Sequence, residues 1–85
     1  MSKHMIFGVH LSDRIKSSND VQQLFTKYGC NIKTRIGLHD VHDDFCSTSG
    51  IIVLEMAGDE ALCDELALKL NAIHGVEVQK MIFKG

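Results

Sequence analysis

The 85-residue sequence contains no proline, no run of basic residues and no apolar stretch of about 18 residues. Without proline, its turns depend on Gly, Asp, Asn and Ser. We find no signal-peptide pattern at its start, so we expect neither a membrane-spanning segment nor export. With a formal charge of −2, electrostatics gives no reason to expect direct binding to nucleic acid or to an anionic membrane.

The sequence has few cysteines, and no two of them have the spacing of a known motif. The three cysteines, Cys30, Cys46 and Cys63, form an odd set without a C-x-x-C motif. This pattern argues against a disulfide scaffold and predicts reduced thiols in the cytoplasm. Cys63 lies in an apolar helical pattern, so we expect a small core residue there.

In the first half of the chain, the pattern of apolar residues predicts a strand followed by a helix. Residues 4–11 have the two-residue period of a strand with one buried face. An apolar stripe from Val21 to Tyr28 predicts a helix. Its start is open, because either Ser12-Asp13 or the residues 17–19 could cap it. Gly29 is expected to end it in the left-handed conformation.

The second half repeats this order. Residues 31–39 alternate as a strand, 40–49 are predicted to form a polar loop, and 50–57 are apolar enough for a central strand. Asp59 after Gly58 is expected to cap a second helix that ends at His74-Gly75. The last strand, 76–83, changes phase after Val78. This change predicts a bulge, or an edge whose second face is also covered.

These elements predict one domain over residues 1–85, of the α+β class. The order is the ferredoxin-like βαββαβ, with an antiparallel sheet of strand order 4-1-3-2 and both helices on one face. One sheet face is left uncovered, and it is too apolar to stay wet. A small domain also gains stability by association, so we expect a homo-oligomer, a dimer or a tetramer. By strand parity we expect the open face to carry part of the last strand and the residues His4, Ile6, Gly8, His10, Ile51, Val53 and Glu55. Lys33, Arg35 and His39 are expected to form a charged margin beside them.

Histidines should gather at one end of this fold. The topology brings the end of the first strand, the loop after the second and the end of the second helix to the same edge, so His10, His39 and His74 are candidate ligand-binding residues. His10 and His39 would be about 10 Å apart at backbone level, two strands from each other.

The spacing His39-x2-His42-x3-Cys46 suits a metal such as zinc, nickel or iron. It matches no closed zinc motif, and a plain solvated hairpin loop is the competing interpretation. Cys46 with His42 could also act as nucleophile and base, but no orienting residue or oxyanion hole is evident.

Other chemistries have weaker support. Asp40, Asp43 and Asp44 could suggest calcium, but the required Gly and terminal Glu are missing, so a charged hairpin tip is the simpler interpretation. We interpret Lys33 and Arg35 as charged residues that keep the edge of the sheet from pairing with another chain. Anion binding is the alternative interpretation. The sequence has no Gly-rich phosphate loop, catalytic carboxylate pair or nucleophile elbow, so we do not expect an enzyme.

Several segments resemble a known family. They are Tyr28-Gly29-Cys30, the run Ile32-Lys33-Thr34-Arg35-Ile36-Gly37-Leu38-His39, the stretch Cys46 to Glu55, Gly58-Asp59 and Gly75-Val76-Glu77-Val78. From about residue 7 to residue 83 the chain resembles the bacterial iron-only hydrogenase system regulators. These are similar to ACT domains and to the C-terminal domain of the nickel-responsive repressor NikR.

The resemblance implies an ACT-like oligomeric regulator that senses a small molecule or a metal, with a link to transcriptional control of hydrogenase or metal metabolism. In NikR two nickel-binding histidines are separated by one residue, whereas two residues separate His39 and His42, and Cys46 comes too early. The DNA-binding segment of NikR has no counterpart in this sequence, so control of transcription would act through a partner or without that kind of DNA reader. A metal-binding protein with a His/Cys loop at the subunit interface is the alternative function.

Overall fold

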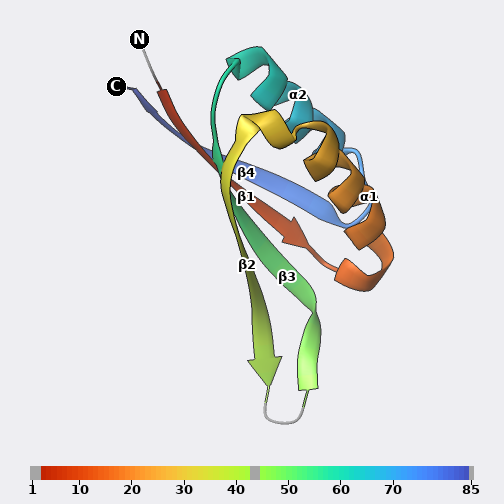
Figure 1. The fold of residues 1–85 in the computed structure, drawn as a ribbon. Helices are drawn as coiled ribbons and strands as arrows, with labels where there is room; N and C mark the ends of the chain where they lie inside the picture. The colour runs from red at the N-terminus through yellow and green to blue at the C-terminus, as the bar shows by residue number, and fades with distance from the viewer. Residues whose placement is uncertain (1–2, 43–44, 85) are drawn as a thin grey trace.

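The computed structural model describes residues 3–42 and 45–84, and their side chains except those of residues 3, 14–16 and 39–49. The elements follow the order β1, α1, a 3₁₀ turn, β2, β3, α2 and β4 (Figure 1). Their bounds are Lys3–Leu11 for β1, Arg14–Lys27 for α1, Gly29–Asn31 for the 3₁₀ turn, Ile32–His42 for β2, Phe45–Met56 for β3, Glu60–Asn71 for α2 and Val76–Lys84 for β4.

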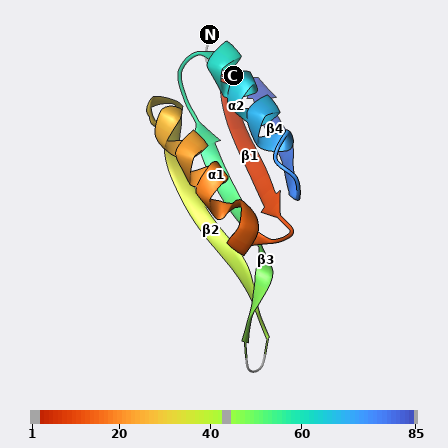
Figure 2. The ribbon, with the colours of Figure 1, turned by 90° about the vertical axis from the view of Figure 1, so that its right-hand side faces the viewer.

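The predicted topology is confirmed. The four strands form one antiparallel sheet in the order β2-β3-β1-β4, which is the expected 4-1-3-2 read from the other edge. Both helices cover the same face of this sheet (Figure 2). The fold is therefore the ferredoxin-like, ACT-like βαββαβ arrangement. Among the described residues, no helix is long and apolar enough to cross a membrane.

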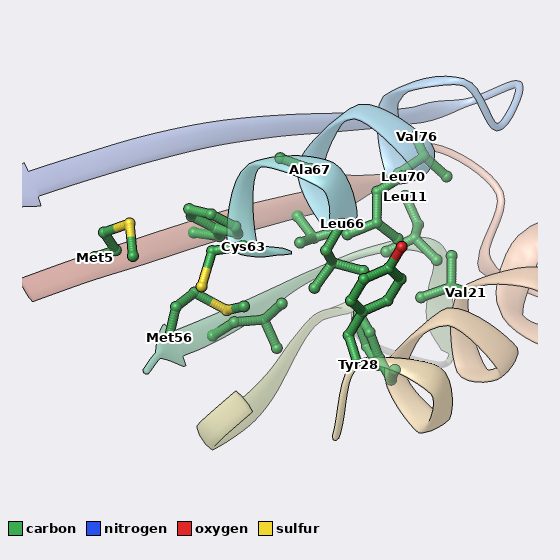
Figure 3. Close-up of a cluster of buried hydrophobic side chains, with 14 residues drawn as sticks. Met5, Leu11, Val21, Tyr28, Met56, Cys63, Leu66, Ala67, Leu70 and Val76 are labelled. Carbon is green, nitrogen blue, oxygen red and sulfur yellow. The ribbon is translucent and has the colours of Figure 1, made fainter. Parts of the chain in front are cut away.

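The core lies between the helices and the covered sheet face (Figure 3). Alternate residues of β1, from Met5 to Leu11, are buried as their period predicts. Cys63 is fully buried on α2, as expected, and Tyr28 closes the core at the end of α1. The Tyr28 hydroxyl donates a hydrogen bond to Glu65 of α2, which joins the two helices.

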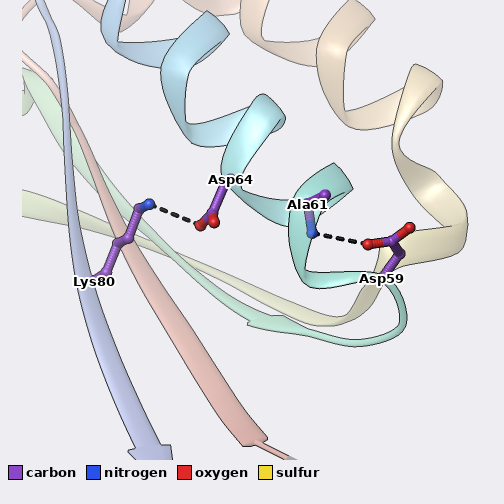
Figure 4. Close-up of polar contacts among 4 residues, drawn as sticks. All are labelled: Asp59, Ala61, Asp64 and Lys80. Carbon is purple, nitrogen blue, oxygen red and sulfur yellow. Dashed lines mark hydrogen bonds and ion pairs between the residues drawn. The ribbon is translucent and has the colours of Figure 1, made fainter.

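Local contacts fix where the second helix and the last strand lie. The Asp59 carboxylate accepts a hydrogen bond from the Ala61 amide at 2.8 Å, so Asp59 is the predicted N-cap of α2 (Figure 4). Lys80 of β4 forms an ion pair with Asp64 of α2 at 2.9 Å. Gly75 has φ +82°, the predicted left-handed conformation, directly before β4.

Two predictions about the ends of helices are wrong. Gly29 has no positive φ, because α1 ends at Lys27 and the chain continues into the 3₁₀ turn. The second helix ends at Asn71, before His74, because the Ile73 amide bonds to the Leu70 carbonyl and the chain passes into tighter turns. The first helix starts at Arg14, which agrees with the longer of the two alternatives.

The predicted loop 40–49 is also wrong in its length. Strand β2 continues to His42 and β3 begins at Phe45, and the ladder pairs Val41 with Cys46. The polar residues there therefore belong to a long two-stranded ribbon that extends beyond the helices (Figure 1). Polarity suggested a loop, but a ribbon without helical cover needs no apolar face.

The predicted bulge in the last strand is absent. β4 pairs with β1 in unbroken register from Lys84 to Val76. The pattern changes phase because the second half of β4 has apolar residues on both faces, and Met81, Ile82 and Phe83 are all exposed.

Candidate functional site

The uncovered face of the sheet is the most apolar exposed surface that the structure describes. Residues paired directly across antiparallel strands have their side chains on the same face, so the register assigns each one. Leu38 pairs with Ile51, and Ile36 pairs with Val53. We call the apolar set on this side the open face: Ile6, Ile36, Leu38, Ile51, Val53, Met81 and Phe83. Five of these side chains are strongly exposed: Ile36 53%, Leu38 53%, Ile51 42%, Met81 53% and Phe83 52%.

A bulge in β2 explains why the open face is more apolar than predicted. Ile32 pairs with Met56, but Thr34 pairs with Glu55, so one extra residue, Lys33, is inserted into β2. Beyond it, the two faces of the strand exchange. The simple alternation of residues 31–39 placed Ile36 and Leu38 in the core, whereas the register places them on the open face.

The predicted charged margin on the open face is therefore wrong for Arg35, and also for His39, whose backbone pairs with Gly50 in a row of the helix side. Arg35 pairs with the buried Leu54 and lies on the helix side. Its guanidinium lies 5.4 Å from the centre of the Phe25 ring and donates a hydrogen bond to Gln22 Oε1 at 3.2 Å. The Lys33 ammonium group lies 3.9 Å from the Glu55 carboxylate. It places a positive charge at the edge of the sheet, as predicted.

A hollow of about 380 Å³ opens in the middle of the open face. Gly8 of β1 lies there, and an added Cβ would meet nothing closer than a carbonyl oxygen at 4.0 Å. His10, Glu77, Gln79 and Ile51 line the hollow with Gly8. A glycine in this central strand therefore leaves room that any other residue would fill.

The polar groups of the hollow come from adjacent strands. His10 of β1 pairs with Glu77 of β4, and Gly8 pairs with Gln79. The Gln79 amide donates a hydrogen bond to the Glu77 carboxylate at 3.0 Å. An imidazole, a carboxylate and an amide thus share an apolar surface, an arrangement typical of small-molecule sites.

Of the three candidate ligand-binding histidines, His10 lines the hollow. The register places the backbone of His39 opposite Gly50, one row beyond the pair of His10 and Ile51. His74 is exposed and precedes Gly75, and it does not line the hollow. Their role in ligand binding stays a prediction.

Sequence reasoning missed Glu77 and Gln79 at this site. Both lie at alternate positions of β4, as His10 and Gly8 do in β1. The signal that could have found them is the combination of the predicted strand order, with β4 beside β1, and the two-residue period.

The candidate metal ligands fall where side chains are not described. His39, His42 and Cys46 lie within the range 39–49, and the backbone register sets His42 opposite Phe45 at the end of the ribbon. Among the described residues, no group of three or more His, Cys, Asp or Glu side chains could hold a metal ion. The metal site stays a prediction, as does a nucleophilic role for Cys46.

No known protein family model matches the chain, and no curated protein matches it. Among solved structures, proteins with the same ferredoxin-like fold match the chain. A PII-like nitrogen regulatory protein from Thiomonas intermedia, bound to ADP, AMP and bicarbonate, has a TM-score of 0.57 at 14% identity, over 99% of this chain and 96% of that one.

An uncharacterized protein from Thermotoga maritima matches along its whole length. Its TM-score is 0.82 at 27% identity, over 98% of this chain and 100% of that one. A formyltetrahydrofolate deformylase from Pseudomonas putida has a TM-score of 0.58 at 17% identity, and this chain spans 28% of that enzyme. These likenesses establish the fold.

Proposed function

We propose that the chain is a regulatory module that senses a small molecule and works as a homo-oligomer. In this proposal the open face is the interface between subunits, and the hollow above Gly8 is the effector site. The observation that carries the proposal is that a hollow lies on the described part of the open face, where His10, Glu77 and Gln79 line it together with Gly8 and Ile51.

The exposed apolar area supports association. Seven apolar side chains from all four strands share the open face, and contiguous patches of this kind mark interaction sites. The same face carries both hydrogen-bond donors and acceptors, with the Gln79 amide beside the Glu77 carboxylate. A surface with both kinds of group suits a twofold interface, because the same patch must pair with itself.

The chemistry of the hollow supports a small polar effector. Imidazole and amide groups can donate or accept hydrogen bonds, and the carboxylate accepts them. A second subunit on the open face would remove water from these groups, which strengthens their interactions with a ligand. The PII-like neighbour, which holds ADP, AMP and bicarbonate, illustrates that this fold accommodates small effectors.

The finer hypothesis follows from the resemblance to the iron-only hydrogenase system regulators. It places this module in the control of hydrogenase or metal metabolism, with a partner protein as the DNA reader. Deletion of the gene in its bacterium should then change hydrogenase transcripts, and unchanged transcripts would remove this link.

The oligomer is tested by sedimentation velocity on two matched variants. Ile36→Lys places a charge on the open face, and Leu68→Lys places it on α2, where Leu68 is 72% exposed. We expect wild type and Leu68→Lys to form the same oligomer and Ile36→Lys to be a monomer. A monomeric wild type at micromolar concentration, or an oligomer that Ile36→Lys leaves intact, would contradict the proposal.

The effector site is tested by a thermal-shift screen of nucleotides and amino acids. Gly8→Val fills the hollow, and the free space at Gly8 allows the added side chain. A true effector stabilises wild type and leaves Gly8→Val unchanged. If every stabilising compound acts equally on both proteins, the hollow is not the effector site.

A further inference from the structure

A second hollow lies on the other side of the sheet, between α1 and the strands β2 and β3. Its volume is about 280 Å³. Gly37 and Gly50 line it, and they belong to the helix side because they pair with Ile52 and Leu11. A Cβ added at Gly37 would meet no atom within 4 Å. The lack of a side chain at Gly37 therefore keeps part of this space open.

The walls of this cavity are apolar and its polar groups come from α1. Leu11, Val21 and Ile52 provide apolar walls, while Ser18 and Gln22 lie on the helix. Among the described residues, no charged side chain lines the cavity. Against the described lining, a charged ligand would lose part of its hydration without a partner of opposite sign.

The orientation of the Gln22 amide determines which of its polar atoms a ligand in this cavity can bind. Its Oε1 atom accepts a hydrogen bond from Arg35 Nη1 at 3.2 Å. This bond uses one of the two acceptor positions of the oxygen and fixes which end of the amide faces Arg35, so the Nε2 group is the hydrogen-bond donor that Gln22 offers to a ligand. Arg35 also lies over the Phe25 ring, so two contacts fix the guanidinium that orients Gln22.

We propose that this cavity is a binding site for a small uncharged molecule with an apolar body and one hydrogen-bond acceptor, a ketone, ester or amide. The apolar body lies against the two glycines and the wall residues, and the acceptor receives a hydrogen bond from Gln22. A cavity of this size is at the lower limit of ligand pockets, which run from about 300 Å³ upward, so the ligand is compact.

The proposal is independent of the effector site above Gly8. Gly8 pairs with Val53 on the open face, whereas Gly37 pairs with Ile52 on the helix side. Gly8→Val and Gly37→Val therefore fill one hollow each, and each variant is the control for the other. Ile51 lines both hollows and is left unchanged for this reason.

The test is an NMR titration of the full chain, labelled with ¹⁵N, with cyclohexanone as probe. We expect cyclohexanone to shift the amide signals of Gly37 and Gly50 in wild type and in Gly8→Val. Gly37→Val should lose the shift of the Gly50 amide while its spectrum remains that of a folded protein. Cyclohexylammonium, which has the same ring with a charged donor, should cause no shift at these positions.

A second variant keeps the cavity open and removes the donor. Gln22→Met has a similar length and no amide, so it should weaken cyclohexanone binding about fivefold, the effect of one lost hydrogen bond. The proposal is overturned if cyclohexanone leaves the Gly37 signal of wild type unchanged up to its solubility. It is equally overturned if Gly37→Val binds the probe as wild type does. Neither result changes the expected oligomer or the effect of Gly8→Val on effectors.

Discussion

Gly75 holds the start of β4 in place, and its replacement by alanine tests this junction. Its φ of +82° lies in the left-handed region, and a Cβ there would meet Ser12 Oγ at 2.8 Å. Alanine in this conformation costs about 1 kcal/mol. Displacement of the Ser12 hydroxyl, which donates a hydrogen bond to the Gly75 carbonyl at 3.1 Å, costs about another 1 kcal/mol. We therefore expect Gly75→Ala to lose about 2 kcal/mol in the free energy of unfolding.

A double-mutant cycle separates the two causes. In a Ser12→Ala background the close contact with Oγ no longer exists, so Gly75→Ala should cost only the conformational part, about 1 kcal/mol. Urea unfolding at one fixed protein concentration measures all four proteins, because association would otherwise alter the apparent stability. Equal costs of Gly75→Ala in both backgrounds would refute the close approach of Ser12. A cost under about 0.5 kcal/mol would refute the left-handed conformation.

Three further changes test other parts of the molecule. Asp59→Ala removes the N-cap of α2 and should cost about 1 kcal/mol in urea unfolding, whereas Asp59→Ser should keep most of it; equal losses would contradict the cap. The Tyr28 hydrogen bond is the largest cause that lowers the pKa of Glu65, so the stability from Glu65 is present above its unfolded pKa and is lost as the pH falls through its lower folded pKa. Tyr28→Phe should raise this pKa toward its ordinary value in a carboxyl NMR titration, and an unchanged pKa would disprove the contact. Native mass spectrometry of untagged wild type should find metal that a His42→Ala, Cys46→Ser variant lacks, and equal metal content in the two proteins removes the predicted metal site.

Periodicity predicted the fold well where one face of an element is buried and the other is exposed. For the alternating residues of β1, only a strand buries the apolar side chains on one face, and for the apolar stripe of α1, only a helix does so. Gly58-Asp59 and Gly75 marked their turns correctly because a cap and a left-handed residue are local features of the chain. The βαββαβ order and its strand arrangement then followed from connection rules alone.

The failures arose where the deciding contact is distant in sequence. Gly29 resembles a helix end, but the backbone carbonyl of Asn31 accepts a hydrogen bond from the Ala57 amide, and its side chain donates to the Ala57 carbonyl. These bonds tie residues 29–31 to the end of β3 as a 3₁₀ turn. Polar residues 40–49 resemble a loop because no local feature shows that each strand finds its ladder partner in the other.

The bulge at Lys33 has the largest consequence for function. Without it, the alternation of β2 buries Ile36 and Leu38 and leaves Lys33, Arg35 and His39 as a charged border. With it, Arg35 turns to the helix side and orients Gln22, while two large apolar residues join the open face. The register that β3 imposes on β2 beyond Lys33, with Lys33 accommodated as one extra residue, thus supplies both the apolar surface of the proposed interface and the donor of the proposed cavity. Deletion of Lys33 keeps Ile36 and Leu38 in register with Val53 and Ile51, so the oligomer should survive it. Insertion of one residue after Lys33 should return both side chains toward the core and abolish association in sedimentation velocity.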